Sequence, residues 1–226
     1  MKNIILKKKQ ILCIIGLWSS GIIASKGVVI IDNFNDTGLN TTSDTSYVNP
    51  NSLGGELDVN YFEGSLFTFG GTVSTSGGTL SVFNTQSTGS QNQGILTLSW
   101  DGVDGSVSPD ADGLGGIDLT AGGIDNAISL DVVSGAAVQF TLKITDMNGN
   151  IGNEVDNLPG LGNNLYNFAD FSGSVDFTNV GSISLDIFFN NSTRNAIEID
   201  NIMTVPEPGV SSFAVIGLLA FLIRRR

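Results

Sequence analysis

The chain has 226 residues, a formal net charge of −12, one cysteine and no histidine. Without histidine it cannot form serine or cysteine hydrolase triads, histidine zinc sites or a histidine general base. Residues 27–204 hold only two basic residues against twenty-one acidic ones, so nucleic acid and anionic membranes would repel this segment. Composition leaves carboxylate chemistry open, as in glycosidases, but most acids in such a chain only solubilise it. We therefore expect a protein that is not an enzyme.

The N-terminus has the pattern of a secretory signal peptide. Lys2 and residues 7–9 form a basic region, residues 11–23 are apolar, and small residues follow. This order predicts a signal helix over residues 1–25, cleaved after Ala24 or Ser25. Cys13 lies inside the apolar segment, so the processed chain is expected to have no thiol, no disulfide and no cysteine metal site.

Residues 27–204 contain short segments of strand character separated by turns rich in Gly, Asn and Asp. The clearest segment is 138–145, where apolar residues alternate with polar ones and the Asn148-Gly149 turn signal follows. No stretch has a convincing helical period. We predict an all-β ectodomain, a single β-sandwich over 27–204 of the jelly-roll type. The expected strands are 28–34, 66–73, 79–83, 95–100, 127–133, 138–145, 175–180, 183–189 and 196–203.

The first and last expected strands both end an apolar run with Asp-Asn, at Asp32 and at Asp200. This pairing resembles the galactose-binding-like jelly rolls of many carbohydrate-binding modules. The resemblance implies that the two termini lie side by side, and that Asp32 and Asp200, with Glu198, are candidate ligands of a structural Ca²⁺ ion. The alternative is that both aspartates bond local backbone groups in Asx turns.

The acidic loop of residues 101–118 is a second candidate for calcium. The sequence from Asp110 to Gly113 is similar to part of an EF-hand loop, but a third acidic position and the closing glutamate are missing. Asp-Gly pairs also form turns without any metal. We therefore favour turn chemistry for this loop.

Aromatic side chains offer candidate platforms for stacking on sugar rings. Tyr61 and Tyr166 lie in segments that look rich in loops, so they are the two residues we select. Trp100 lies in phase with Leu96 and Leu98 along one strand, which favours its burial in the core.

The C-terminal segment, residues 205–226, has Pro206, Glu207 and Pro208, then an apolar run over 210–223, then Arg224, Arg225 and Arg226. This order resembles the PEP-CTERM sorting signal of bacterial exported proteins. Segments 113–120 and 176–180 are also similar to segments that recur upstream of such tails. The resemblance implies a short transmembrane helix in the inner membrane, cleavage by an exosortase-type protease, and a place at the cell surface or in the extracellular matrix, with links to exopolysaccharide and biofilm.

Physical chemistry agrees with this interpretation of the tail. Two prolines one residue apart form a stiff extended hinge, and the arginines stay on the cytoplasmic side. The apolar run spans about 21 Å at roughly 1.5 Å per residue, less than a bilayer core of about 30 Å. Snorkelling arginine stems and local thinning would close part of that gap.

The sequence therefore predicts a non-catalytic surface or matrix protein that is sorted through its tail. The first alternative is a calcium-supported carbohydrate-binding module, which shares the same fold and location. A glycoside-active enzyme with two carboxylates is the second.

Overall fold

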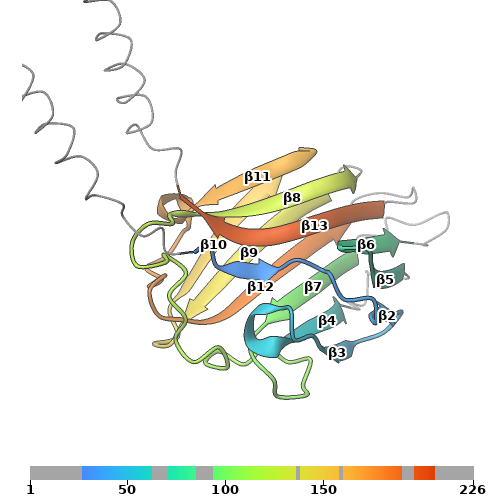
Figure 1. Cartoon of the computed structure of the whole chain (residues 1–226), viewed down its shortest axis with the longest axis horizontal. Coiled ribbons are helices and arrows are strands. Elements are labelled where there is room, and N and C mark those ends of the chain that lie inside the picture. Colours follow the sequence, from blue (N-terminus) through green and yellow to red (C-terminus); the bar gives the residue numbers. More distant parts are fainter. Residues whose placement is uncertain are drawn as a thin grey trace, which may run out of the picture.

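The computed structural model describes residues 27–62, 71–84, 94–135, 138–157, 160–189 and 196–206. These residues form an all-β sandwich of two antiparallel sheets (Figure 1). They contain no α-helix, only two short 3-10 turns at Leu53–Gly55 and Phe168–Asp170. The predicted signal helix and nearly all of the predicted tail lie outside the described residues.

Each sheet mixes strands from both halves of the chain. One has the order β11-β8-β13-β6-β5-β2 with β1 beside β13, and the other has the order β10-β9-β12-β7-β4-β3. The first sheet contains β1 (Ile30–Asp32), β2 (Asn40–Thr41), β5 (Gly71–Ser76), β6 (Thr79–Asn84), β8 (Ala127–Gly135), β11 (Gly162–Asn167) and β13 (Ala196–Val205). The second contains β3 (Thr45–Val48), β4 (Glu56–Phe62), β7 (Gly94–Trp100), β9 (Val138–Asp146), β10 (Ile151–Asn157) and β12 (Val180–Phe189).

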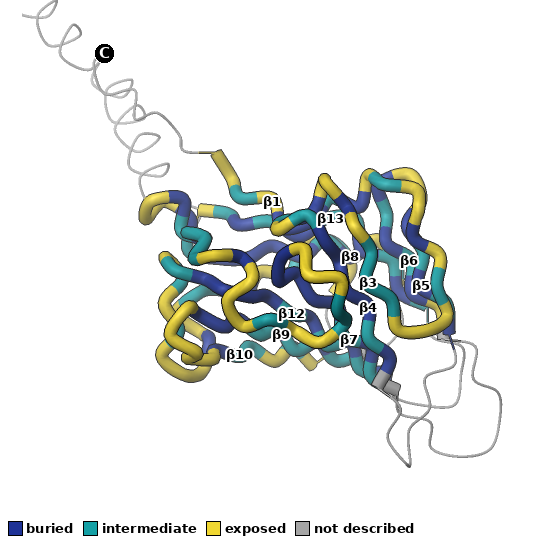
Figure 2. The backbone as a smooth tube through the Cα atoms, turned by 90° about the horizontal axis from the view of Figure 1, so that it is seen from below, coloured by how far each residue is buried: buried dark blue, intermediate teal, exposed yellow. Residues whose placement is uncertain are grey.

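The core lies between the sheets and is built by period-two alternation. On β7, the side chains of Leu96, Leu98 and Trp100 are fully buried, while Thr97 between them is only half-buried. Successive side chains of a strand point to opposite faces, so one face of each strand supplies the core. Figure 2 shows these buried stretches along the strands, with exposed stretches concentrated in the turns that join them.

Most of the expected strands form, but the expected strand over 175–180 is wrong, and most of the expected strand over 66–73 lies outside the described residues. Asp176 Oδ1 accepts hydrogen bonds from the backbone N–H and the hydroxyl of Thr178, at 2.9 and 2.7 Å, and the N–H of Asn179 bonds the carbonyl of Asp176. These bonds close a turn, and β12 begins only at Val180. A carboxylate that satisfies the backbone locally competes with a sheet ladder.

The terminal strands lie side by side, as the sequence predicts. Ile30 faces Met203 and Asp32 faces Ile202 in the β1–β13 ladder. β1 and β6 pair with the same edge of β13 at different places, and β6 takes the segment from Ala196 to Ile199. Asp200 and Asn201 therefore lie between the part of β13 that pairs with β6 and the part that pairs with β1. On the other edge of β13, the register against β8 shifts between Ile199 and Ile202. Figure 1 shows these strands meeting along β13.

The two segments that resemble recurring parts of exported domains lie against each other. Leu119 N–H bonds the carbonyl of Phe177, and Ile117 and Val180 exchange two backbone hydrogen bonds, all at 2.9 Å. The long connection between β7 and β8 is thereby fastened to the start of β12.

Candidate functional site

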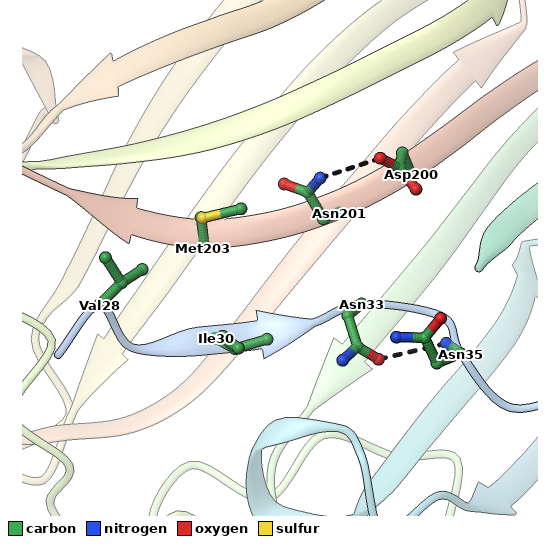
Figure 3. Close-up of a pocket in the computed structure, with 7 residues that line it drawn as sticks. All are labelled: Val28, Ile30, Asn33, Asn35, Asp200, Asn201 and Met203. Atoms are coloured by element: carbon green, nitrogen blue, oxygen red, sulfur yellow. Dashed lines mark hydrogen bonds between the residues drawn. The ribbon is translucent and has the colours of Figure 1, made fainter.

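A pocket of about 350 Å³ lies between β13 and the chain in and around β1. Seven side chains line it, and we call it the terminal-strand pocket. Figure 3 shows a division in the lining, with apolar residues toward one end and amide and carboxylate groups toward the other. The lining residues are Val28, Ile30, Asn33, Asn35, Asp200, Asn201 and Met203.

The polar end is fixed by short-range hydrogen bonds. Asn35 N–H bonds Asn33 Oδ1 at 3.2 Å, and Asn201 Nδ2 donates to Asp200 Oδ2 at 3.1 Å. Asn201 Oδ1 is buried and has no hydrogen-bond partner. The β5–β6 turn closes this end, because a Cβ built on Gly78 would stand 3.0 Å from Asn35 Oδ1 and 3.9 Å from Asp200 Oδ1. Gly78 has φ +86°, a backbone conformation that favours glycine.

The apolar end comes from exposed side chains. Val28 and Ile30 are about half exposed, and Met203 of the facing strand lies beside them. A concave site with a few fixed polar groups beside apolar surface suits a small polar ligand, and its volume is near the lower end of the roughly 300–1,000 Å³ typical of ligand pockets. Its lining has a single carboxylate and no basic residue.

Asp32 does not reach this pocket, which corrects its prediction as a calcium ligand. Its side chain is 0% exposed and points into the core. One carboxylate oxygen accepts the Phe34 N–H at 2.8 Å, which is the Asx turn that we gave as the alternative, and the other accepts Trp100 Nε1 at 3.0 Å. Burial raises the pKa of Asp32 to about 6, although both hydrogen bonds oppose the rise. One local and one long-range hydrogen bond thus satisfy both oxygens of Asp32.

Glu198 and Asp200 are also not joined with Asp32 into a metal centre. Glu198 Oε2 accepts the hydroxyl of Ser134 at 3.0 Å, whereas Asp200 lines the pocket and bonds Asn201. Across the part of the chain that the structure describes, no three acidic, histidine or cysteine side chains form a metal-binding group.

The two predicted aromatic platforms are buried, so the structure contradicts that role. Tyr61 is 7% exposed on β4 and Tyr166 is 3% exposed on β11, and a ring must be exposed to stack on a sugar. Tyr61 lies in phase with the core residues Leu57 and Val59 on β4, a period-two pattern that is visible in the sequence and indicates burial. Trp100 is fully buried, as predicted.

The acidic loop after β7 uses its carboxylates in turns. Asp104 Oδ1 accepts the Ser106 N–H at 2.7 Å and Asp118 Oδ1 accepts the Thr120 N–H at 2.9 Å, both two residues on. This confirms turn chemistry for those two residues. Asp101 behaves differently, because it is 1% exposed and lies beside Asp58 of β4. Burial, followed by the contact with Asp101, raises the pKa of Asp58. Sequence reasoning did not anticipate this meeting of two buried acids.

Of the predicted sorting motif, only Pro206 is described, and it is exposed directly after the end of β13. Glu207, Pro208 and Arg224 to Arg226 lie outside the described residues. No helix in the described ranges has the length and apolar character to cross a bilayer.

Comparisons with known proteins name no family. No family model matches the sequence, and no curated protein matches it significantly. Among solved structures, the chain is similar to the family 11 carbohydrate-binding module of a cellulosomal cellulase from Clostridium thermocellum, with 16% identity, TM-score 0.39, and coverage of 80% of this chain and 95% of that chain. An exo-β-agarase has 14% identity, TM-score 0.41 and coverage of 81% and 25%. TmCBM61, in complex with β-1,4-galactotriose, has 15% identity, TM-score 0.33 and coverage of 66% and 82%. At these scores we base neither fold nor function on the similarities.

Proposed function

We propose that the chain is a non-catalytic exported protein whose sandwich binds carbohydrate in the terminal-strand pocket. The observation that carries this proposal is the lining, where Asn33, Asn35, Asp200 and Asn201 stand beside apolar side chains. Sugar hydroxyls both donate and accept hydrogen bonds, and asparagine amides do the same. The apolar end can pack against the C–H face of a sugar ring. We take the sandwich to be a jelly roll, in keeping with its adjacent terminal strands.

Binding rather than catalysis fits the chemistry of the pocket. Glycoside hydrolysis by the usual route needs two carboxyl groups placed on either side of the bond to be cleaved. The pocket lining supplies one, from Asp200. A single carboxylate among amides is suited to hold hydroxyl groups by charge-assisted hydrogen bonds.

The proposal is tested by calorimetric titration of the full-length chain, purified in detergent, with oligosaccharides from the producing cell's own exopolysaccharide. Asp200→Ala and Asn201→Ala should each weaken binding about tenfold, the effect of losing roughly one good hydrogen bond. Asn148→Ala, an exposed asparagine in the β9–β10 turn, is the matched control and should bind like the parent chain. Equal affinity of the parent chain and all three variants would show that the oligosaccharide does not bind in the pocket.

We further propose that residues 205–226 act as a PEP-CTERM tail, which anchors the chain in the inner membrane until an exosortase-type protease releases it to the cell surface or matrix. The support is the order of Pro206, Glu207 and Pro208 before an apolar run and three arginines. The exposed position of Pro206 just after β13 agrees with a recognition motif that begins where the sandwich ends.

A further inference from the structure

Three carboxyl groups lie buried on the side of β4 that faces away from the core. Glu56 is 0% exposed, and Asp58 and Asp101 are each 1% exposed. Glu56 and Asp58 alternate on β4 with the core residue Leu57, and Asp101 directly follows β7, the strand that pairs with β4. Burial of this kind is unusual, because carboxylates are seldom fully buried unless they are paired.

Most oxygens of this group lack a hydrogen-bond donor. Both carboxylate oxygens of Asp58, Oδ1 of Asp101 and Oε1 of Glu56 are buried without a partner. The remaining oxygens hold the loop that follows β7, since Glu56 Oε2 accepts the N–H groups of Asp104 and Gly105, and Asp101 Oδ2 accepts that of Asp110 at 2.6 Å. Two ionised carboxylates cannot donate to each other, so Asp58 and Asp101 satisfy one another only when one of them holds a proton.

No described basic side chain compensates this charge. Lys143 is the one basic residue in the described ranges, and it lies on β9, which β12 and β7 separate from β4. Burial, followed by contact with Asp101, raises the pKa of Asp58 to about 8. Burial also raises the pKa of Asp101. With a pKa of about 8, Asp58 holds a proton at pH 7 unless a cation takes the place of that proton, because an unpaired buried charge is strongly destabilising.

Further oxygen atoms surround the pair. Ser46 lies opposite Asp58 in the β3–β4 ladder, and its hydroxyl oxygen is buried. Ser99 lies opposite Asp58 on the other side, on β7, and is also buried. The loop closes tightly over this end of the sheet, because a Cβ on Gly113 would stand 1.5 Å from the carbonyl oxygen of Asp101.

We propose that Asp58 and Asp101 bind one divalent cation of the calcium type, which fastens the loop of residues 101–113 to strand β4. Two carboxylates balance the charge of one such ion. The described side chains offer two carboxylates here rather than a three-ligand centre, so hydroxyl, carbonyl and water oxygens would complete the shell. Calcium suits such a mixed and irregular set, whereas magnesium demands a near-octahedral one. The site is separate from the terminal-strand pocket, so either proposal can fail alone.

The test measures thermal unfolding and calorimetric binding of the full-length chain in detergent at pH 7, with CaCl₂ or with EDTA and without any glycan. At a hundredfold excess over Kd, calcium should raise the melting temperature by about 5–10 °C. Asp58→Asn should abolish both the shift and the binding heat. Asp131→Asn, the same change on β8 of the other sheet, should keep both.

Several results would overturn the proposal. A parent chain that shows no calcium binding by calorimetry would do so whether or not the variant folds. A calcium shift that survives in Asp58→Asn would place the ion elsewhere. A third result would be that calcium has no effect, while the melting temperature falls between pH 7 and pH 9 in the parent chain but not in Asp58→Asn. That result would show that a proton shared by the two carboxyls takes the place of the ion.

Discussion

At the scale of single residues, the hydrogen bond from Trp100 to Asp32 joins the two sheets across the core. Trp100 belongs to β7 in one sheet, and Asp32 ends β1 in the other. Both side chains are fully buried. The bond therefore holds the N-terminal strand, which forms one wall of the terminal-strand pocket, against the opposite layer.

Replacing Trp100 by phenylalanine should destabilise the protein strongly. The change removes the indole N–H, leaves an oxygen of the buried Asp32 carboxyl unpaired and opens space in the core. We expect a loss of about 3 kcal/mol or more in the free energy of unfolding, measured by urea denaturation. A loss below about 1 kcal/mol would mean that this bond contributes little.

The raised pKa of Asp32 predicts a pH dependence of stability. The folded state holds a proton on Asp32 that the unfolded state releases, from pH 3.8 up to about 6. The free energy of unfolding should therefore fall as pH rises through that window, by about 3 kcal/mol for this group alone. Stability should be measured from pH 4 to pH 7 in the parent chain and in Asp32→Asn. The slope near pH 5 should be smaller in the variant by about one proton, and equal slopes would contradict the assignment.

At the scale of elements, the connection between β7 and β8 depends on close backbone approaches. Gly113 packs on the carbonyl of Asp101, and Leu114 N–H bonds the carbonyl of Gly181 at 2.9 Å. These contacts seat the loop over the buried acids of β4. A side chain at position 113 would have to displace backbone atoms.

Gly113→Ala should therefore destabilise the protein by about 2 kcal/mol or more, because a methyl group cannot fit 1.5 Å from the Asp101 oxygen. Gly160→Ala is the matched control, since its Cβ would meet only Asn164 Oδ1 at an ordinary 3.8 Å. Limited proteolysis and urea denaturation would compare the two variants. Identical stabilities would show that the loop can move aside without cost.

Period-two alternation in the sequence predicts much of the fold and little of the site. The alternation is clear in the sequences of β7 and β9. It is also present in β4, although the predicted strands do not include that segment, and Tyr61 was therefore expected in a loop. The strand that carries Tyr166, β11, contains three asparagines among its six residues, so its sequence shows no such alternation. It pairs with a single neighbour, β8. The nearness of Asp32 and Asp200 was predictable, but their opposite orientations were not, since Asp32 is buried in the core whereas Asp200 lines the pocket. Register shifts interrupt the ladders of both β1 and β13, and the sequence pattern does not reveal them.

At the scale of the whole molecule, the sorting proposal for residues 205–226 makes a prediction of its own. Replacing Glu207 by alanine should block processing of the tail and leave a larger, membrane-bound form in the producing cell. Immunoblots of membrane and medium fractions would show this. Unchanged mass and release would argue against the sorting proposal without affecting the pocket.

The central claim is that the terminal-strand pocket binds carbohydrate, and hydrogen–deuterium exchange of the full-length chain, with and without the producing cell's exopolysaccharide, tests it most directly. We predict slower exchange in peptides covering residues 28–35 and 200–203, the two segments that supply the lining. Peptides from β9 and β10, in the other sheet, should be unchanged. Protection confined to that other sheet, or no protection at all, would contradict the proposed site.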